Sequence, residues 1–164
     1  MPKWGGHGFH DPMPKSYSKW LILKNDLAWT MADLVNYIKE FLVEHHGSAG
    51  ADWIRDKLYI EGFNEFDALG TCKQSDGNSC QEWSNEYSSP SRAAGLQNGI
   101  QWALNSYNIQ TNTIMPSIVG IWKHPSITDA DDSVGTRMKY FFKDYYGIHG
   151  GTGLPNVHIY SKYY

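Results

Sequence analysis

The 164-residue sequence lacks the signatures of several large classes of protein. No window approaches the roughly 18 uninterrupted apolar residues of a membrane span, and the N-terminus lacks the apolar core of a secretory signal. Neither a P-loop motif nor a dinucleotide-binding glycine fingerprint is present. There are no internal repeats and no low-complexity tract. We therefore expect a soluble chain that has neither a nucleotide-binding loop nor a repeat architecture.

Cysteine is scarce, with Cys72 and Cys80 as the two examples. Two cysteines alone cannot supply the four ligands of a structural zinc site. They flank a polar stretch that contains the turn signal Asp76-Gly77, so a loop disulfide is feasible. Two unpaired thiols in a reducing cell fit the sequence equally well, and the polar surroundings do not favour Cys72 as a catalytic nucleophile.

Aromatic side chains are abundant, at 15% of residues, and include seven tryptophans and eleven tyrosines. A chain of this length suits one domain, and its 41% hydrophobic residues argue against disorder. The aromatic content exceeds what one small core needs, which indicates that some of these rings face partner surfaces. Composition therefore favours assembly with other protein.

The net charge of −3 conceals three blocks of different sign. Residues 1–24 contain four lysines and one aspartate, for a net charge of +3. Residues 25–90 contain twelve acids and four bases, for −8, and residues 91–164 contain six bases and four acids, for +2. Such a chain can set a basic edge on a polyanion and turn an acidic face outward or toward a basic neighbour. A solvated acidic helix face explains the middle block equally well.

The first 24 residues cannot build a core by themselves. Aromatic residues alternate with lysines there, and Pro2, Pro12 and Pro14 favour an extended chain. We expect this arm to lie along a polyanion or along another copy of the protein. The residues expected at a subunit interface are the aromatics of the arm and of the C-terminal tail: Trp4, Phe9, Tyr17, Trp20, Tyr160, Tyr163 and Tyr164.

The clearest helix prediction runs from Asn25 to His46. Apolar residues fall at three- and four-residue spacing on one face of it, and acids take most of the other side. The apolar face consists of Leu27, Met31, Leu34, Val35, Ile38, Phe41 and Leu42. Gly47 ends this helix, and residues 48–50 link it to a shorter helical piece at residues 53–58.

A further helix is predicted to begin at Ser89 or Ser91, either of which can cap it, and to run to Tyr107. The proline between the two serines fits the first helical position. Gly95 and Gly99 lie on the face of this helix. Small residues at that spacing let another backbone approach closely, although each glycine costs about 1 kcal/mol relative to alanine.

The remaining segments are less regular. Residues 60–90 are rich in Gly, Ser, Asn and Asp, which predicts a loop-rich insertion with both cysteines. The apolar run 118–122 is too short to separate a helix from a buried strand, and we favour a helix. Ser126 is then the cap of a last helix that Gly147 ends, with acids in its first turn and bases after them. Residues 148–164 form a Gly-rich loop and an extended aromatic tail.

Taken together, these elements predict a mainly α protein. A helical bundle of about four helices occupies residues 25–147. It lies between an extended basic N-terminal arm, residues 1–24, and the extended aromatic C-terminal tail.

Few residues suggest catalysis. A Gly-lined segment with His149, followed by His158 in a strand-like segment, is an arrangement that some hydrolases use. A small hydrolase that employs one of these histidines with an acid or Cys72 is therefore the alternative from another functional class. His7 and His10 have metal-ligand spacing but lie in a Gly-rich stretch, so we expect neither a metal site nor a cofactor.

Three short motifs occur in order along the chain. They are Pro14-Lys15-Ser16-Tyr17-Ser18-Lys19-Trp20, then Pro90-Ser91-Arg92-Ala93 leading to Trp102-Ala103-Leu104-Asn105, then Met138-Lys139-Tyr140-Phe141-Phe142 leading to Tyr145-Tyr146-Gly147. In composition and order, these motifs resemble the coat (major capsid) proteins of rod-shaped and filamentous archaeal DNA viruses, the rudivirus and lipothrixvirus group. They cover about a quarter of the chain.

The resemblance implies a helical bundle in the C-terminal half, an N-terminal helical arm, and paired subunits that wrap linear double-stranded DNA into a filament. It also implies phosphate contacts by Lys15, Lys19 and Arg92, and charge alone adds Lys3 and Lys24. The inserted residues and the acidic middle block depart from the family pattern. A heterodimer with a more basic, paralogous coat protein would balance that charge.

We therefore predict a non-enzymatic coat subunit that self-assembles into a helical filament around double-stranded DNA, in a virion assembled in the host cytoplasm. Single lysine–phosphate contacts are weak and salt-sensitive, and repetition along a filament makes them strong through avidity. A protein-only filament or tail subunit, whose arm inserts into its neighbour, is the second alternative. The choice between homodimer and heterodimer and the presence of a membrane envelope stay open.

Overall fold

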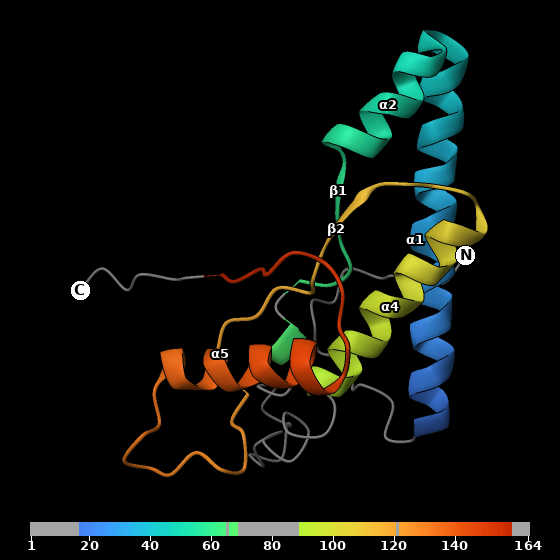
Figure 1. Ribbon diagram of the computed structural model, residues 1–164. Coiled ribbons are helices and arrows are strands. Elements are labelled where there is room, and N and C mark those ends of the chain that lie inside the picture. Colours follow the sequence, from blue (N-terminus) through green and yellow to red (C-terminus); the bar gives the residue numbers. More distant parts are fainter. Residues whose placement is uncertain (1–16, 65, 69–88, 121, 159–164) are drawn as a thin grey trace, which may run out of the picture.

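A computed structural model describes residues 17–64, 66–68, 89–120 and 122–158. Their elements are the helices α1 (Tyr17–His46), α2 (Ser48–Lys57), α4 (Pro90–Ser106) and α5 (Val134–Phe142), the strands β1 (Tyr59–Glu61) and β2 (Asn112–Ile114), the 3-10 turn η1 (Phe66–Ala68) and the π-helix η2 (Lys143–Ile148). Figure 1 shows α1 along one side, with α2 folded back beside its end and α4 packed against its other half. The predicted mainly α bundle of about four helices is confirmed. No described helix, α1 included, combines the length and the apolar character needed to cross a bilayer.

α1 begins at Tyr17, well before the predicted start at Asn25. The prediction that residues 17–24 are part of an extended arm is therefore wrong, and Lys19 and Lys24 are helical residues. No proline or glycine occurs in residues 17–24, so extending the helix toward the N-terminus costs little once α1 has formed. The lysines obscured this in the sequence because they interrupt the apolar pattern.

Two glycines with different roles fold α2 back along the end of α1. Gly47 has a positive φ of 59°, which residues with a side chain rarely adopt, and its N–H donates to the carbonyl of Val43 at 2.8 Å. Gly50 is buried against α1, where a Cβ would lie 2.3 Å from the carbonyl oxygen of Leu42. The predicted end of α1 at Gly47 is confirmed, but residues 48–50 are the first turn of α2 and not a link.

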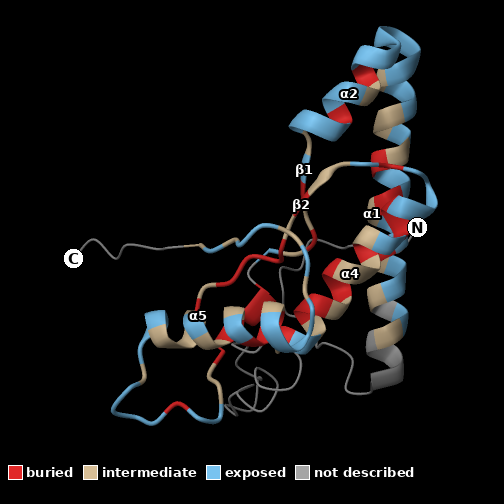
Figure 2. Ribbon diagram, viewed as in Figure 1, coloured by how far each residue is buried: buried red, intermediate tan, exposed pale blue. Residues whose placement is uncertain are grey.

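The core lies between α1, α4 and the segments that follow α4. Figure 2 shows the buried positions of α1 on the side that faces α4. Ala28 and Ala32 are buried there, and a Cβ on Gly99 would meet the Cβ of Ala28 at 3.6 Å, so α1 makes the close approach predicted for this glycine. The largest fully buried side chains are Tyr145, Phe66, Phe141, Ile54, Leu96, Ile100, Leu104, Ile109, Met115 and Ile118.

α4 begins as the sequence predicts. Ser89 is the cap, because its Oγ accepts the N–H of Arg92 at 3.4 Å. Pro90 takes the first helical position, where no donor is needed. The helix ends with Tyr107 as its C-cap, which agrees with the predicted end.

The predicted insertion is shorter than expected. β1 pairs in parallel with β2, with Ile60 opposite Thr113, and η1 follows β1 after a short connection. Regular structure therefore continues past residue 60. Cys72 and Cys80 lie in residues 69–88, outside the described residues.

The apolar run at 118–122 does not form the predicted helix. The buried carboxylate of Asp67, in η1, accepts the N–H of Val119 at 2.7 Å and the N–H of Trp122 at 3.3 Å. These amides are therefore bound by a side chain and not by carbonyls of a helix. Ile118 also pairs with Val157 as an isolated parallel bridge. The helix prediction is wrong because a distant acceptor decides the conformation.

α5 begins later than predicted. Its cap is Ser133, whose Oγ accepts the N–H of Thr136 at 3.1 Å, and not Ser126. Asp132, expected in the first turn, precedes the helix and makes a two-point ion pair with Arg137 at 2.6 and 2.8 Å. The hydrogen bonds from Arg137 hold the pKa of the Asp132 carboxyl well below its usual range. This acid therefore ties the preceding loop to α5.

The predicted stop at Gly147 is also wrong, because the chain continues through this glycine as η2. Beyond η2 the chain turns back onto the two tyrosines of the π-helix. The hydroxyl of Tyr145 donates to the carbonyl of Thr152 at 2.7 Å, and that of Tyr146 donates to the carbonyl of Gly153 at 2.9 Å. These bonds fix the start of the Gly-rich tail against η2.

Candidate assembly surface

The outward face of α1 leaves large apolar side chains in water. Leu34, Tyr37 and Phe41 follow one another at three- and four-residue spacing and expose 53%, 69% and 51% of their surface. We call these three residues the apolar stripe. The sequence sets Leu34 and Phe41 on the same face as Val35, but only the Val35 side is covered, and Val35 is 3% exposed. Figure 2 shows this uncovered side of α1, turned away from α4.

Three rings meet where the end of α4 approaches α1. The ring centroid of Trp29 lies 5.4 Å from that of Trp102 and 5.9 Å from that of Tyr107, with both pairs nearly perpendicular. We call these residues the aromatic cluster. The Tyr107 hydroxyl donates to Asp33 Oδ1, and this bond raises the pKa of Tyr107. Trp102 is 62% exposed, so the cluster joins two helices and still offers a ring to a partner.

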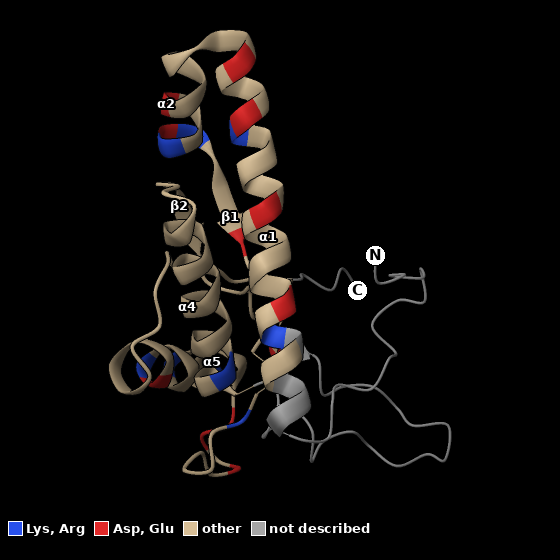
Figure 3. Ribbon diagram, turned by 90° about the vertical axis from the view of Figure 1, so that its right-hand side faces the viewer, with Lys and Arg blue, Asp and Glu red and all other residues tan. Residues whose placement is uncertain are grey.

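Four carboxylates run along the outward face of α1. Asp26, Asp33, Glu40 and Glu44 are exposed, and their spacings of seven and four residues bring them to one side of the helix. We call them the acidic stripe, and Figure 3 shows acidic positions along this side of α1. None of the ion pairs within the described residues includes them. Lys39 is directed elsewhere, since its Nζ donates to the carbonyl of Asn108 at 3.4 Å.

The two stripes and the cluster are neighbours on one surface. A helix turns by about 100° per residue, which puts Trp29 on one flank of the acidic stripe and Tyr37 and Phe41 on the other. Carboxylates therefore lie between two sets of accessible apolar groups. We call this combination the assembly surface.

Two of the residues predicted to contact DNA lie close together. The Lys24 side chain lies 4.0 Å from the positions that a Cβ on Gly95 or Gly99 would take. Arg92 precedes Gly95 by about one turn of α4 and is partly buried. Lys24 and Arg92 thus share one end of the α1–α4 pair, away from most of the acidic stripe. Lys19 lies earlier in α1.

The other predicted residues cannot be compared with the structure in the same way. Tyr17 and Trp20 lie in the first turns of α1, so they are helical and not part of an extended arm. The rest lie outside the described residues: Lys3, Trp4, Phe9, Lys15, Cys72, Cys80, Tyr160, Tyr163 and Tyr164. Sequence reasoning missed Trp29 and Tyr37. Trp29 is an aromatic residue among the acids, on the side opposite the predicted apolar face, and Tyr37 lies between the acids and that face.

The histidines of the hydrolase alternative lie in or near the tail. His149 is exposed at the end of η2, and the backbone N–H of His158 donates to the carbonyl of Ile118 at 2.9 Å. Among the described residues, His124 lies beside a carboxylate, with its Nε2 3.5 Å from Asp144 Oδ2. Within the described ranges, no group of three or more His, Cys, Asp and Glu side chains is arranged to hold a metal ion.

His124 has a structural task. Its Nδ1 accepts the N–H of Ser126 at 3.0 Å, so Nε2 carries the hydrogen that is directed at Asp144. The ring also stacks on Tyr140, with centroids 4.8 Å apart. These contacts fasten the loop before α5 to α5 and η2.

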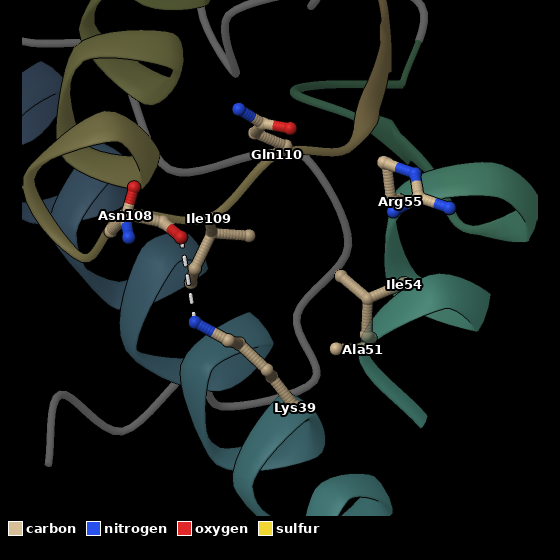
Figure 4. Close-up of a pocket in the computed structure, with 7 residues that line it drawn as sticks. All are labelled: Lys39, Ala51, Ile54, Arg55, Asn108, Ile109 and Gln110. Atoms are coloured by element: carbon tan, nitrogen blue, oxygen red, sulfur yellow. Dashed lines mark hydrogen bonds between the residues drawn. The ribbon is translucent and has the colours of Figure 1, made fainter. Parts of the chain in front are cut away.

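A pocket of about 320 Å³ opens between α1, α2 and the segment after α4 (Figure 4). Ile54 and Ile109 form its buried apolar floor. Lys39 and Arg55 stand at its rim, but both are engaged within the chain, Arg55 through ion pairs with neighbouring aspartates of α2. This pocket therefore has no uncommitted cation with which to hold an anion.

No protein-family model, no curated protein and no solved structure matches the chain. The resemblance to viral coat proteins thus rests on the three sequence motifs alone. What the described residues contribute to a functional argument is the assembly surface.

Proposed function

We propose that this chain is a structural subunit, and not an enzyme, that assembles with copies of itself or with a paralogous protein into a filament. The observation that supports it best is the apolar stripe of α1, with three large side chains at least half exposed. Contiguous apolar groups at the surface mark places that other protein covers. The neighbouring carboxylates favour one partner and one orientation over others.

Burial of the apolar stripe against a neighbour stabilises the contact modestly. Complete burial of one such side chain contributes about 1.5–3 kcal/mol, so covering the exposed half of Leu34, Tyr37 and Phe41 contributes about 1 kcal/mol each. Association costs several kcal/mol in lost freedom, so one contact of this kind is weak. Repetition of this contact along a filament makes the total association strong. The proposal therefore predicts assembly above a threshold concentration.

The finer proposal is that the filament is a viral coat that encloses double-stranded DNA. Its support is the motif resemblance together with the basic residues Lys19, Lys24 and Arg92 near one end of the α1–α4 pair. In such a filament that end faces the phosphates, and the acidic stripe faces protein or solvent, because carboxylates repel a polyanion. The virion is then where the protein resides.

The assembly proposal is tested by making the apolar stripe polar. In Leu34→Gln/Phe41→Gln, the two exposed side chains lose most of their apolar surface, so the threshold concentration should rise about tenfold or more while circular dichroism stays unchanged. Ile148→Gln is the matched control, since Ile148 is 65% exposed but lies in η2. Sedimentation gives the threshold, and negative-stain micrographs give the particle shape. Equal thresholds for all three proteins would contradict the proposal.

The DNA proposal is tested separately on purified particles. Nucleic acid is extracted from them and typed, and the Lys19→Glu/Lys24→Glu variant is compared with the wild type for DNA content. Reversal of two phosphate contacts per subunit should remove most of the DNA and lower the salt concentration at which the remainder dissociates. Particles that form without nucleic acid would replace the DNA coat with a protein-only filament.

A further inference from the structure

The acidic stripe selects a partner of opposite charge. Its four carboxylates are exposed and belong to none of the ion pairs within the described residues, so a basic neighbour gains attraction there without displacing an internal pair. The α1 helix of a second copy does not fit. In parallel and in antiparallel pairing alike, carboxylates would face carboxylates.

The flanks of the acidic stripe select the side chains next to those basic groups. On one flank, the exposed ring of Trp102 can take a lysine or an aromatic side chain over its face. On the other flank, the apolar stripe gains from being covered by an apolar group. A fitting partner therefore combines lysines with rings and is narrow enough to lie along a single helix.

We propose that residues 1–16 of a second copy bind this face, along the acidic stripe and between the aromatic cluster and the apolar stripe. This inference rests on the proposed function, because it names the partner segment of the same assembly surface. Residues 1–16 contain Lys3 and Lys15, the rings of Trp4 and Phe9, and one acid. Their three prolines disfavour a helix, and an extended segment can follow α1 without competing for its backbone hydrogen bonds.

The lengths of the two segments agree. From Asp26 to Glu44 the acidic stripe spans about 27 Å, at 1.5 Å of rise per helical residue. From Lys3 to Lys15 an extended chain spans at most about 40 Å. The two lysines can therefore reach carboxylates near both ends of the stripe.

Return of the arm onto its own helix fits less well. An extended arm that turned back at Tyr17 would bring Lys15 within about 7 Å of the helix start, short of Asp26 at about 13 Å. Lys3 could reach at most about 46 Å along the helix, a range that includes Glu44 at about 40 Å. The backbone of Lys15 would stop short of the stripe, which leaves Lys3 alone to pair with its far end. The arm of a second copy is not connected to the start of the helix that it binds, so both of its lysines can lie beside carboxylates of the stripe.

The inference divides the basic residues between two tasks. Lys3 and Lys15, predicted from the sequence to contact phosphate, bind carboxylates of the next copy. This division leaves the proposed phosphate contacts to Lys19, Lys24 and Arg92. Because the arm and the acidic stripe are different surfaces, the contact is heterologous and propagates from copy to copy, which is how open filaments grow.

The test exchanges charges between the two surfaces of the full-length chain. The stripe variant is Asp26→Lys/Glu40→Lys, and the arm variant is Lys3→Glu/Lys15→Glu. Each alone should assemble at a threshold concentration about tenfold or more above that of the wild type, because two lysine–carboxylate pairs are replaced by pairs of like charge in either variant. An equimolar mixture of the two should assemble near the wild-type threshold, because the two reversed charges of the arm then meet the two reversed charges of the stripe, and the unchanged arm meets the unchanged stripe.

A matched control and a nuclease step complete the design. Asp52→Lys/Asp131→Lys makes the same change of charge at exposed acids of α2 and of the loop before α5, outside the acidic stripe, and should assemble like the wild type. Circular dichroism confirms that each variant is folded. All thresholds are measured by sedimentation with and without prior nuclease treatment.

Each other outcome overturns the inference in an identifiable way. Failure of the mixture to assemble would indicate an arm bound to its own helix. Loss of assembly in the arm variant and on nuclease treatment, with the stripe variant unaffected, would assign the arm to DNA. Equal thresholds for wild type and both variants would remove the arm–stripe contact and leave the proposed function intact. A wild type that stays monomeric at every concentration would remove both.

Discussion

Replacing Asp67 by alanine is expected to lower the free energy of unfolding by about 2–5 kcal/mol. Asp67 is 1% exposed, and its carboxylate oxygens accept the N–H groups of Val119 at 2.7 Å and Trp122 at 3.3 Å. Without the carboxylate, both buried amides lose this acceptor, at about 1–3 kcal/mol each, with the longer contact at the lower end. Asp67→Asn keeps one carbonyl oxygen and should cost about half as much.

Urea unfolding followed by circular dichroism and tryptophan fluorescence measures this effect, with Trp122 as a probe inside the affected segment. The matched control is Asp129→Ala, because Asp129 is fully exposed and pairs only at the surface with Lys123. Its free energy of unfolding should stay within about 0.5 kcal/mol of the wild-type value. If Asp67→Ala unfolds at the same urea concentration as this control, segment 118–122 does not depend on the buried acceptor, and the explanation of its conformation fails.

Gly99→Ala should raise the free energy of unfolding by up to about 1 kcal/mol, because alanine favours a helix and the new Cβ would meet Ala28 at an ordinary 3.6 Å. Gly50→Ala should instead lower the free energy of unfolding by about 1–3 kcal/mol, because the new Cβ would lie 2.3 Å from a backbone oxygen of α1. Urea unfolding measures both variants, and midpoints that shift in the same direction for Gly50→Ala and Gly99→Ala would contradict these assignments. Asp132→Asn should lose less stability in acid than the wild type: Arg137 holds the native pKa of Asp132 below the unfolded value, so its stabilisation is present above about pH 4 and disappears as the pH falls. Thermal melts between neutral and acid pH measure the difference, and a constant gap between the two proteins would refute it.

The sequence predicts the structure correctly where interactions between residues close together in the chain decide it. The Ser89-Pro90 pair predicts the start of α4, and a serine hydroxyl does cap that helix. Gly47 predicts the end of α1 because a left-handed backbone suits glycine. The start of α1 was misjudged for the opposite reason, since helix propagation depends on the absence of breakers and not on a regular apolar pattern.

Long-range contacts explain what the sequence could not supply. Segment 118–122 takes its conformation from Asp67, which lies far away in the sequence and shows no local pattern. The periodicity of α1 correctly defines an apolar face, but it cannot tell which part of that face α4 will cover. The exposure of Leu34 and Phe41 follows from the position of α4 and was therefore visible only in three dimensions.

The parallel pairing of β1 with β2 has a consequence for the order of folding. The α1–α2 hairpin involves residues that are near one another in sequence, so it can form early. Tyr59 meets Asn112 only after about 50 intervening residues have been closed into a loop, at an entropic cost of about 3–4 kcal/mol. Contacts of such long sequence separation slow the search for the native state. A nascent chain that ends before β2 would thus contain a folded α1–α2 hairpin and an unpaired β1. The backbone of β1 could then pair with a strand other than β2.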